Sequence, residues 1–218
     1  MARRTGSNGA QTADALRRAA LALFARHGYA AVSMRMIAAE VGVQPGALYH
    51  HMGSKQDLLR DLMVAHMHEL LAAWADRPEA TDPATDPATD PAADPAADSV
   101  AALSGFVRFH IRHHMGREDA VFISYMELRN LEPANFATLE ALRSRYEANL
   151  RAILELGAAR GAFHAPDAPV ATRAIISMLT GVTHWFRGDG RLSAAQIEAL
   201  YTDMTLRAVA PHAPIQGG

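Results

Sequence analysis

The sequence contains no cysteine, which excludes disulfides, thiolate metal sites and cysteine nucleophiles together. It also lacks an uninterrupted apolar run of the roughly 18 residues needed to cross a bilayer, so we expect no membrane partner. The basic N-terminus, residues 1–6, is not followed by the apolar core of a signal peptide. Together these absences predict a cytoplasmic protein.

Strand alternation and a catalytic constellation are also missing. Apolar and polar residues alternate nowhere, whereas apolar residues recur at helical spacing along most of the chain. Tyr125, Glu127 and Arg129 are of types that enzymes use, but no nucleophile–base set or phosphate-binding glycine loop accompanies them. The sequence therefore predicts an all-α protein that is not an enzyme and uses no cofactor. A small all-α hydrolase or isomerase is the weaker alternative.

Charge is distributed unevenly along the chain, although the formal net charge is only −2. Residues 1–60 hold eight basic residues against three acids, and residues 76–98 hold seven acids against the single base Arg77. A basic module on an otherwise neutral or acidic protein is the electrostatic footprint of nucleic-acid contact. The N-terminal segment is therefore the candidate nucleic-acid-binding part.

Start and stop residues divide the N-terminal third into helices. The spacing predicts a helix that ends at Gly28, a short helix capped by Ser33, a turn at Gly42 and a third helix over residues 44–51. Two short helices joined by a glycine turn form a helix-turn-helix, which places its last helix in the major groove of DNA.

Apolar residues then predict how these helices pack. We expect Met36, Ile37 and Val41 to form the apolar face of the second helix. Ser54 and Asp57 have the spacing of a capping box, so a fourth helix should follow.

A four-residue repeat occupies the segment after this helix. The phrase Asp-Pro-Ala recurs four times from Asp82 onward and brings no large apolar side chain with it. Such a segment cannot pack into a core, so we expect an extended linker over residues 76–98. Helical spacing resumes at Ser99 and predicts helices near residues 100–114, 121–129, 134–160, 167–187 and 193–209, among whose inward side chains we expect Phe136.

Three histidines raise the question of a metal site. His110, His113 and His114 recur at positions i, i+3 and i+4 of one predicted helix, a spacing that can place two imidazoles on a metal. No HExxH motif and no obvious acidic third ligand accompany them. We therefore expect pocket or surface histidines and no metal.

Residues 33–55 carry the most specific motif, Ser-Met-Arg-Met-Ile-Ala-Ala-Glu-Val-Gly-Val-Gln-Pro-Gly-Ala-Leu-Tyr-His-His-Met-Gly-Ser-Lys. This run resembles the DNA-binding signature of the TetR (tetracycline-repressor) family, and the likeness extends over about residues 12–60. Met52 stands where the family usually has phenylalanine and can fill the same core position. The resemblance implies a helix-turn-helix DNA-binding domain over residues 1–55 and a helical ligand-binding and dimerisation domain over 56–218.

The expected function is a transcriptional repressor that binds palindromic operator DNA as a homodimer and is released by a small-molecule effector. We expect two copies to pair through the helices predicted over 167–187 and 193–209. An effector in the central bundle would favour a conformer in which the two DNA-reading helices are wrongly spaced.

Residue chemistry narrows the DNA contacts within this motif. Glutamine can pair bidentately with adenine, and alanine can contact a thymine methyl, which suits Gln44 and Ala47. Tyr49, His50 and Lys55 suit phosphates, and Lys55 at a helix N-terminus adds the attraction of the helix dipole. For His50, packing against the fourth helix is an equally good interpretation. The DNA-binding candidates are Arg35, Gln44, Pro45, Gly46, Ala47, Tyr49, His50 and Lys55.

Two phrases bear on the effector. Residues 126–131 and 181–187 resemble segments of TetR-family regulators that sense acyl-CoA thioesters in fatty-acid, aromatic or steroid breakdown. Arginines beside an apolar bundle suit a ligand with an oily tail and an anionic nucleotide head, which favours Arg129 and Arg143. The full set of effector candidates is Phe109, His113, Phe122, Met126, Arg129, Arg143, Tyr146, Met178 and Trp185, and for each of them core packing is an equally good explanation. A multidrug-efflux repressor that senses lipophilic compounds is the alternative.

Overall fold

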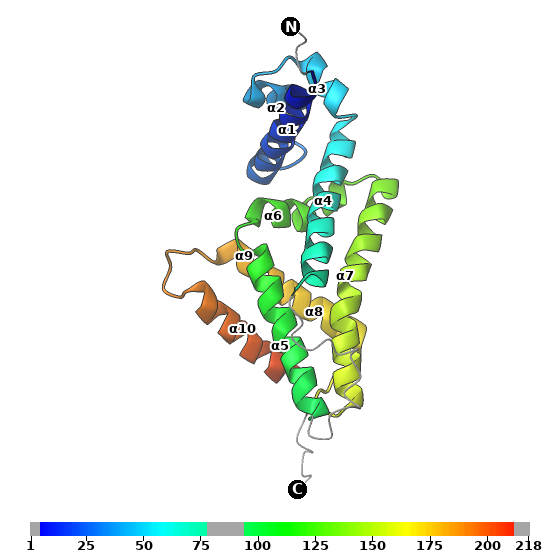
Figure 1. The fold of residues 1–218 in the computed structure, drawn as a ribbon, viewed down its shortest axis with the longest axis vertical. Helices are drawn as coiled ribbons and strands as arrows, with labels where there is room; N and C mark the ends of the chain where they lie inside the picture. Colours follow the sequence, from blue (N-terminus) through cyan, green and yellow to red (C-terminus); the bar gives the residue numbers. More distant parts are fainter. Residues whose placement is uncertain (1–4, 78–93, 212–218) are drawn as a thin grey trace. The chain divides into compact units, whose positions relative to one another are not determined.

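The computed structural model describes residues 5–77 and 94–211, and every regular element in these ranges is a helix (Figure 1). The predicted all-α class is confirmed. None of the described helices combines the length and apolarity needed to cross a membrane. The chain forms two compact units: unit 1 comprises Met1–Leu70 and Arg117–Arg143, and unit 2 comprises Leu71–Gly116 and Ser144–Gly218. Unit 1 thus extends beyond residues 1–55, and the functional boundary at residue 55 stays a prediction.

The first helices of unit 1 follow the sequence cues. Helix α1 (Thr5–His27) buries Leu16, Ala20 and Phe24, which recur every four residues along one face. It ends at Gly28, whose positive φ of 78° suits glycine in a helix-terminating turn.

Helix α2 (Met34–Val41) is capped as predicted, because the Ser33 hydroxyl accepts the Met36 N–H at 3.2 Å. The predicted inner face of this helix is wrong at one position. Met34 is buried with Ile37, whereas Met36 is 41% exposed. The helix starts at Met34, so Met34 and Ile37 share the inward face and Met36 falls on the outer one.

Helix α3 (Pro45–His51) follows the turn at Gly42, whose φ is 73°. Helix α4 (Lys55–Ala75) then begins with the predicted capping box. The Ser54 N–H donates to Asp57 Oδ2 at 3.0 Å, and the Asp57 N–H donates to Ser54 Oγ at 3.0 Å. The hydrogen bond from the Ser54 hydroxyl lowers the pKa of the Asp57 carboxyl below its ordinary value. The structure therefore holds the carboxylate form, which is the form that caps the helix.

Unit 1 is completed by a later part of the chain. Helix α6 (Glu118–Met126) packs against α1 and is followed by the short 3₁₀ helix η2 (Leu128–Asn130) and by the start of α7 (Pro133–Ala159). The predicted helix over 121–129 is therefore too long, because α6 ends at Met126 and a turn at Glu127 separates it from η2. Phe136 of α7, expected to face inward, is 40% exposed.

The linker predicted over residues 76–98 is wrong at its C-terminal end. Helix α5 (Pro95–His114) starts before Ser99, because the Asp94 carboxylate accepts the Ala96 N–H at 3.0 Å and proline occupies the first helical position. The last repeat of the predicted linker thus supplies a helix cap and a first turn. Residues 78–93 of that linker lie outside the described residues.

Three more helices, α8 (Ala168–Thr180), α9 (Val182–Trp185) and α10 (Ala194–Ala208), follow in unit 2, with α8 and α10 packing on α5. The single helix predicted over 167–187 is interrupted at Gly181 and ends at Trp185. Two features favour this break. Glycine is a poor helix former. The Thr180 carbonyl also accepts a hydrogen bond from the Thr183 hydroxyl at 2.9 Å, so a side chain provides it with a partner.

One glycine of α7 should be sensitive to substitution. A methyl group at Gly157 would collide with the buried Phe163 ring, so Gly157→Ala should lower the free energy of unfolding by about 1–3 kcal/mol. Gly105→Ala in α5 is the matched control, because a methyl there meets no atom within 4 Å. The better helix propensity of alanine should make that variant as stable as the wild type or up to about 1 kcal/mol more stable. Urea unfolding followed by circular dichroism compares the two, and equal stabilities would contradict the predicted collision.

Candidate functional site

Helix α3 is held by one face and open to solvent on the other. Leu48 and the following Met52 are buried, which confirms the core role expected for Met52. Tyr49, next to Leu48, is 57% exposed. Gln44 and Pro45 at the start of the helix are exposed as well. A short helix anchored in this way presents its N-terminal residues and its outer face to a groove of DNA.

The other DNA-binding candidates lie on neighbouring elements of unit 1. Arg35 is exposed in the first turn of α2, and Ala47 and His50 belong to α3 by their backbone. Gly46 is exposed, and a β-carbon added there would meet no atom within 4 Å. The exposed candidates therefore come from the first turn of α2 and from the start and outer face of α3.

Lys55, the only lysine in the sequence, occupies the first position of α4. Its Nζ lies 4.1 Å from the centroid of the Tyr29 ring and donates to the Ala30 carbonyl at 3.5 Å. Burial lowers the pKa of the Lys55 ammonium, and the Glu127 carboxylate opposes that shift. The side chain is thus a partly buried cation that rests on the turn between α1 and α2.

The same turn contacts a buried carboxylate. Glu127, 7% exposed, accepts the Tyr29 N–H on Oε1 at 3.2 Å and the side-chain amide of Asn130 on Oε2. Gln56 of α4 completes the cluster by donating from Nε2 to the Tyr29 hydroxyl at 3.0 Å and to the Asn130 carbonyl at 2.6 Å. We call Tyr29, Lys55, Gln56, Glu127 and Asn130 the Glu127 network.

Sequence reasoning missed the Glu127 network. Gln56 and Asn130 are ordinary polar residues near helix ends, and Glu127 drew attention only as a residue of a type that enzymes use. Glu127 and Tyr29 are 98 positions apart in the chain. No periodicity or short motif marks a pairing over such a separation.

The effector candidates fall in both units. Phe122, Met126, Arg129 and Arg143 belong to unit 1, whereas Phe109, His113, Tyr146, Met178 and Trp185 belong to unit 2. In unit 1, Met126 and Arg129 are exposed. Arg143 already has protein partners, because Nη1 donates to the Ser124 carbonyl at 3.4 Å and Nε lies 3.8 Å from a Glu140 oxygen.

In unit 2, four of the five candidates take part in aromatic packing, namely Phe109, His113, Tyr146 and Trp185. Phe109 packs against His113, with ring centroids 5.6 Å apart. Buried Tyr146 lies 3.0 Å by its hydroxyl from His110 Nδ1, while His110 Nε2 lies 3.0 Å from the Thr180 hydroxyl. Hydroxyl partners on both ring nitrogens make His110 a hydrogen-bonded core residue.

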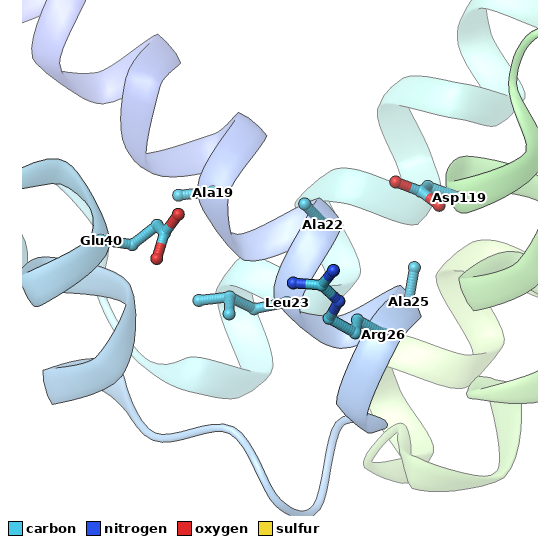
Figure 2. A pocket seen from close by; sticks show the side chains of 7 residues that line it. All are labelled: Ala19, Ala22, Leu23, Ala25, Arg26, Glu40 and Asp119. Carbon is cyan, nitrogen blue, oxygen red and sulfur yellow. The ribbon is translucent and has the colours of Figure 1, made fainter.

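A solvent-open cleft of about 430 Å³ lies in unit 1 (Figure 2). Helix α1 lines most of it, and one acid from α2 and one from α6 complete the wall; the lining residues are Ala19, Ala22, Leu23, Ala25, Arg26, Glu40 and Asp119. Its three charged side chains are all exposed and therefore solvated. None of these residues was a candidate, because solvent-facing alanines and charges on a helix carry no distinguishing pattern.

Comparison with known proteins adds sequence and fold relationships. The model "Bacterial regulatory proteins, tetR family" matches residues 16–62, and "Tetracyclin repressor-like, C-terminal domain" matches residues 96–209. A bacterial regulatory protein of the tetR family from Rhodococcus RHA1 is 30% identical, with a TM-score of 0.77 over 93% of this chain and 99% of that one. The HTH-type transcriptional repressor KstR2 of Rhodococcus jostii (strain RHA1) is 24% identical over 196 residues, which cover 88% of this chain and 89% of that protein.

A third relative was solved with its ligands. AibR, in complex with isovaleryl coenzyme A and operator DNA, shares the fold at 24% identity and a TM-score of 0.70, over 88% of this chain and 97% of AibR. The C-terminal family model covers more than half of this chain, and the tetR-family structure from Rhodococcus is matched over nearly its full length. The chain therefore belongs to the tetR family and is a helix-turn-helix, DNA-binding transcriptional regulator rather than an enzyme.

Proposed function

We propose that this regulator is a cytoplasmic repressor that binds palindromic operator DNA as a homodimer and is released by an acyl-CoA thioester. The observation that carries the DNA-binding part is the presentation of α3. Leu48 anchors the helix in the core of unit 1, while Gln44 and Tyr49 face solvent. Gln44 suits an adenine edge, and Tyr49 and Lys55 suit phosphates.

Exposed apolar side chains in unit 2 support the homodimer. Val170 of α8, Trp185 of α9, and Leu200 and Met204 of α10 are each between 48% and 58% exposed. Large exposed apolar residues on the last three helices of a single copy are typical of an interface. For Trp185 this exposure favours the interface over effector contact. A two-fold symmetric pairing would set the distance between the two α3 helices and hence the half-site spacing.

The acyl-CoA part rests on one relative and on one arginine. AibR binds isovaleryl coenzyme A, and its likeness to this chain makes the same ligand class the first one to test. Arg129 of η2 is exposed and has no ion pair within residues 5–77 and 94–211, so its guanidinium is available to a phosphate. Arg143 is less available because Glu140 and Ser124 already contact it.

Release would follow from differential binding. The effector would bind more tightly to a conformer with misplaced α3 helices than to the DNA-binding conformer. Operator affinity would then fall by at most the ratio of the effector's affinities for these two conformers. Helix α4 runs from unit 1 into unit 2 and is therefore one covalent route by which such a change can reach the DNA-binding helices.

Salt dependence tests the phosphate contacts. Operator affinity should fall steeply with salt because phosphate contacts release counterions. Lys55→Ala should weaken binding to all sequences alike and flatten the slope by about one unit for each equivalent contact. Gln44→Ala should instead relax base preference at one position of each half-site. Mobility shifts on the DNA upstream of the regulator's own gene measure both effects.

The control for Lys55→Ala is Arg17→Ala, which removes a positive charge from an exposed ion pair with Asp14 in the same unit. An unchanged slope in Lys55→Ala would show that this lysine is only a neighbour of the helix cap. Failure of the wild-type protein to shift its upstream DNA would contradict the proposed function itself.

The homodimer is tested at α10. Met204→Glu should convert the dimer into a monomer in light scattering coupled to size exclusion, because it places a charge in the apolar interface. Its folding should change little, since Met204 is 49% exposed. Ala152→Glu adds the same charge at an exposed site of α7 and should leave the dimer intact. A dimer that survives Met204→Glu would place the interface elsewhere.

The effector is tested by competition. A long-chain or aromatic acyl-CoA should dissociate the DNA complex, and the free acid should do so poorly, because only the thioester brings both an apolar tail and an anionic nucleotide head. Arg129→Ala should weaken this response and leave DNA affinity without effector nearly intact. Arg145→Ala, at another exposed arginine, is the charge-matched control.

Calorimetric titration with acyl-CoAs, free acids and lipophilic cations discriminates between effector classes. Binding of lipophilic cations alone would exclude the acyl-CoA and favour an efflux repressor.

A further inference from the structure

Glu127 is a buried acid that neither the DNA contacts nor the effector contacts proposed above require. Its side chain is 7% exposed at the end of α6, yet it carries a carboxylate. Burial of such a group is unfavourable unless hydrogen bonds and nearby cations compensate it. One compensating hydrogen bond comes from a residue 98 positions away in the chain, because Glu127 Oε1 accepts the backbone N–H of Tyr29 at 3.2 Å. This carboxylate therefore ties the end of α6 to the turn between α1 and α2.

The turn fits closely against the carboxylate. Gly28 has a φ of 78°, and a β-carbon placed on it would lie 3.4 Å from Glu127 Oε1. The carboxylate thus lies next to Gly28 and accepts a hydrogen bond from the following residue. Loss of the carboxylate would leave the Tyr29 N–H without its acceptor and open space beside the turn.

Tyr29 in turn supports the cation that we assign to operator phosphate. Lys55 Nζ lies 4.1 Å from the Tyr29 ring centroid and 3.5 Å from the Ala30 carbonyl oxygen. Gln56, the next residue, donates both to the Tyr29 hydroxyl and to the Asn130 carbonyl. The turn is therefore in direct contact with the first two residues of α4, and a shift of the turn would move the support of the lysine.

We propose that Glu127 is a positioning residue for operator binding, whose carboxylate holds the α1–α2 turn so that Lys55 is directed to a phosphate. This inference rests on the proposed DNA-binding function. It also gives the effector a route of action within unit 1, because Arg129 lies between Glu127 and Asn130 in the chain. An anionic group bound by Arg129 would act on the short segment that holds the Glu127 carboxylate and the Asn130 carbonyl, two parts of the Glu127 network.

A double-mutant cycle on operator affinity tests the proposal. Glu127→Ala should weaken binding to the regulator's upstream DNA about tenfold, which corresponds to roughly 1.4 kcal/mol. It should also flatten the salt slope by about one unit, as Lys55→Ala does. If Glu127 acts through Lys55, the two effects should not add, and the double variant should bind at least about threefold more tightly than additivity predicts. General destabilisation would give additive losses and an unchanged salt slope.

The single lysine provides a second readout without DNA. Reductive methylation followed by peptide mass spectrometry reports the reactivity of Lys55 apart from that of the terminal amine. Glu127→Ala should raise the labelling rate of Lys55 at least about twofold, because a side chain released from the Tyr29 ring is more accessible to the reagent. The same measurement on wild type with upstream DNA should show protection.

Two variants serve as controls. Glu127→Gln keeps an oxygen that can accept the Tyr29 N–H, and its N–H can donate to the Asn130 side-chain oxygen once the Asn130 amide turns over. Its operator affinity and salt slope should therefore stay within about threefold and a few tenths of a unit of wild type. Glu69→Ala removes the same charge from an exposed ion pair with Arg117 in the same unit and should change neither readout.

The proposal would be overturned if the affinity losses of the double-mutant cycle were additive. It would also be overturned if folded Glu127→Ala kept the wild-type salt slope or labelled Lys55 at the wild-type rate. Absence of wild-type binding to the upstream DNA would be a different result. It would refute the proposed function, and this inference with it.

Discussion

The burial of one face of α1 is the constraint on which the DNA-binding surface depends. Helices α2 and α3 are only eight and seven residues long, and helices of that length are not stable alone in water. Both pack on α1, whose buried Leu16, Ala20 and Phe24 form one continuous apolar face. Helix α6 packs on α1 as well, so the same helix supports the DNA-reading element and the segment that carries Glu127.

Local cues allowed much of the fold to be predicted. Gly28, Ser33 and the pair Ser54–Asp57 mark helix ends through backbone conformation and hydrogen bonds between near neighbours, and all are found where expected. Errors arose where two cues conflicted. Asp94 and the proline after it looked like another repeat of a linker but cap α5, and the apolar stripe through Gly181 concealed a helix break.

Only one part of the candidate site could likewise be predicted from local sequence cues. The surface of α3 could be predicted because its residues are contiguous in the chain and the motif is specific. The Glu127 network could not, because Gln56 and the Asn130 carbonyl that it contacts are 74 positions apart. The division of the effector candidates between two units could not be predicted either. Apolar spacing along a helix indicates which face is inward but not which other helices that face contacts.

Gly46 has a consequence for how regulators of this kind diverge. It lies at the start of α3 between Pro45 and Ala47, and a β-carbon introduced there would meet no atom within 4 Å. A small substitution at this position would add a group to the exposed start of α3, which we propose contacts DNA, without meeting a packed side chain. If α3 reads DNA as we propose, duplicated copies of such a gene could acquire different operators through single changes at Gly46, because an added β-carbon there meets no neighbouring atom.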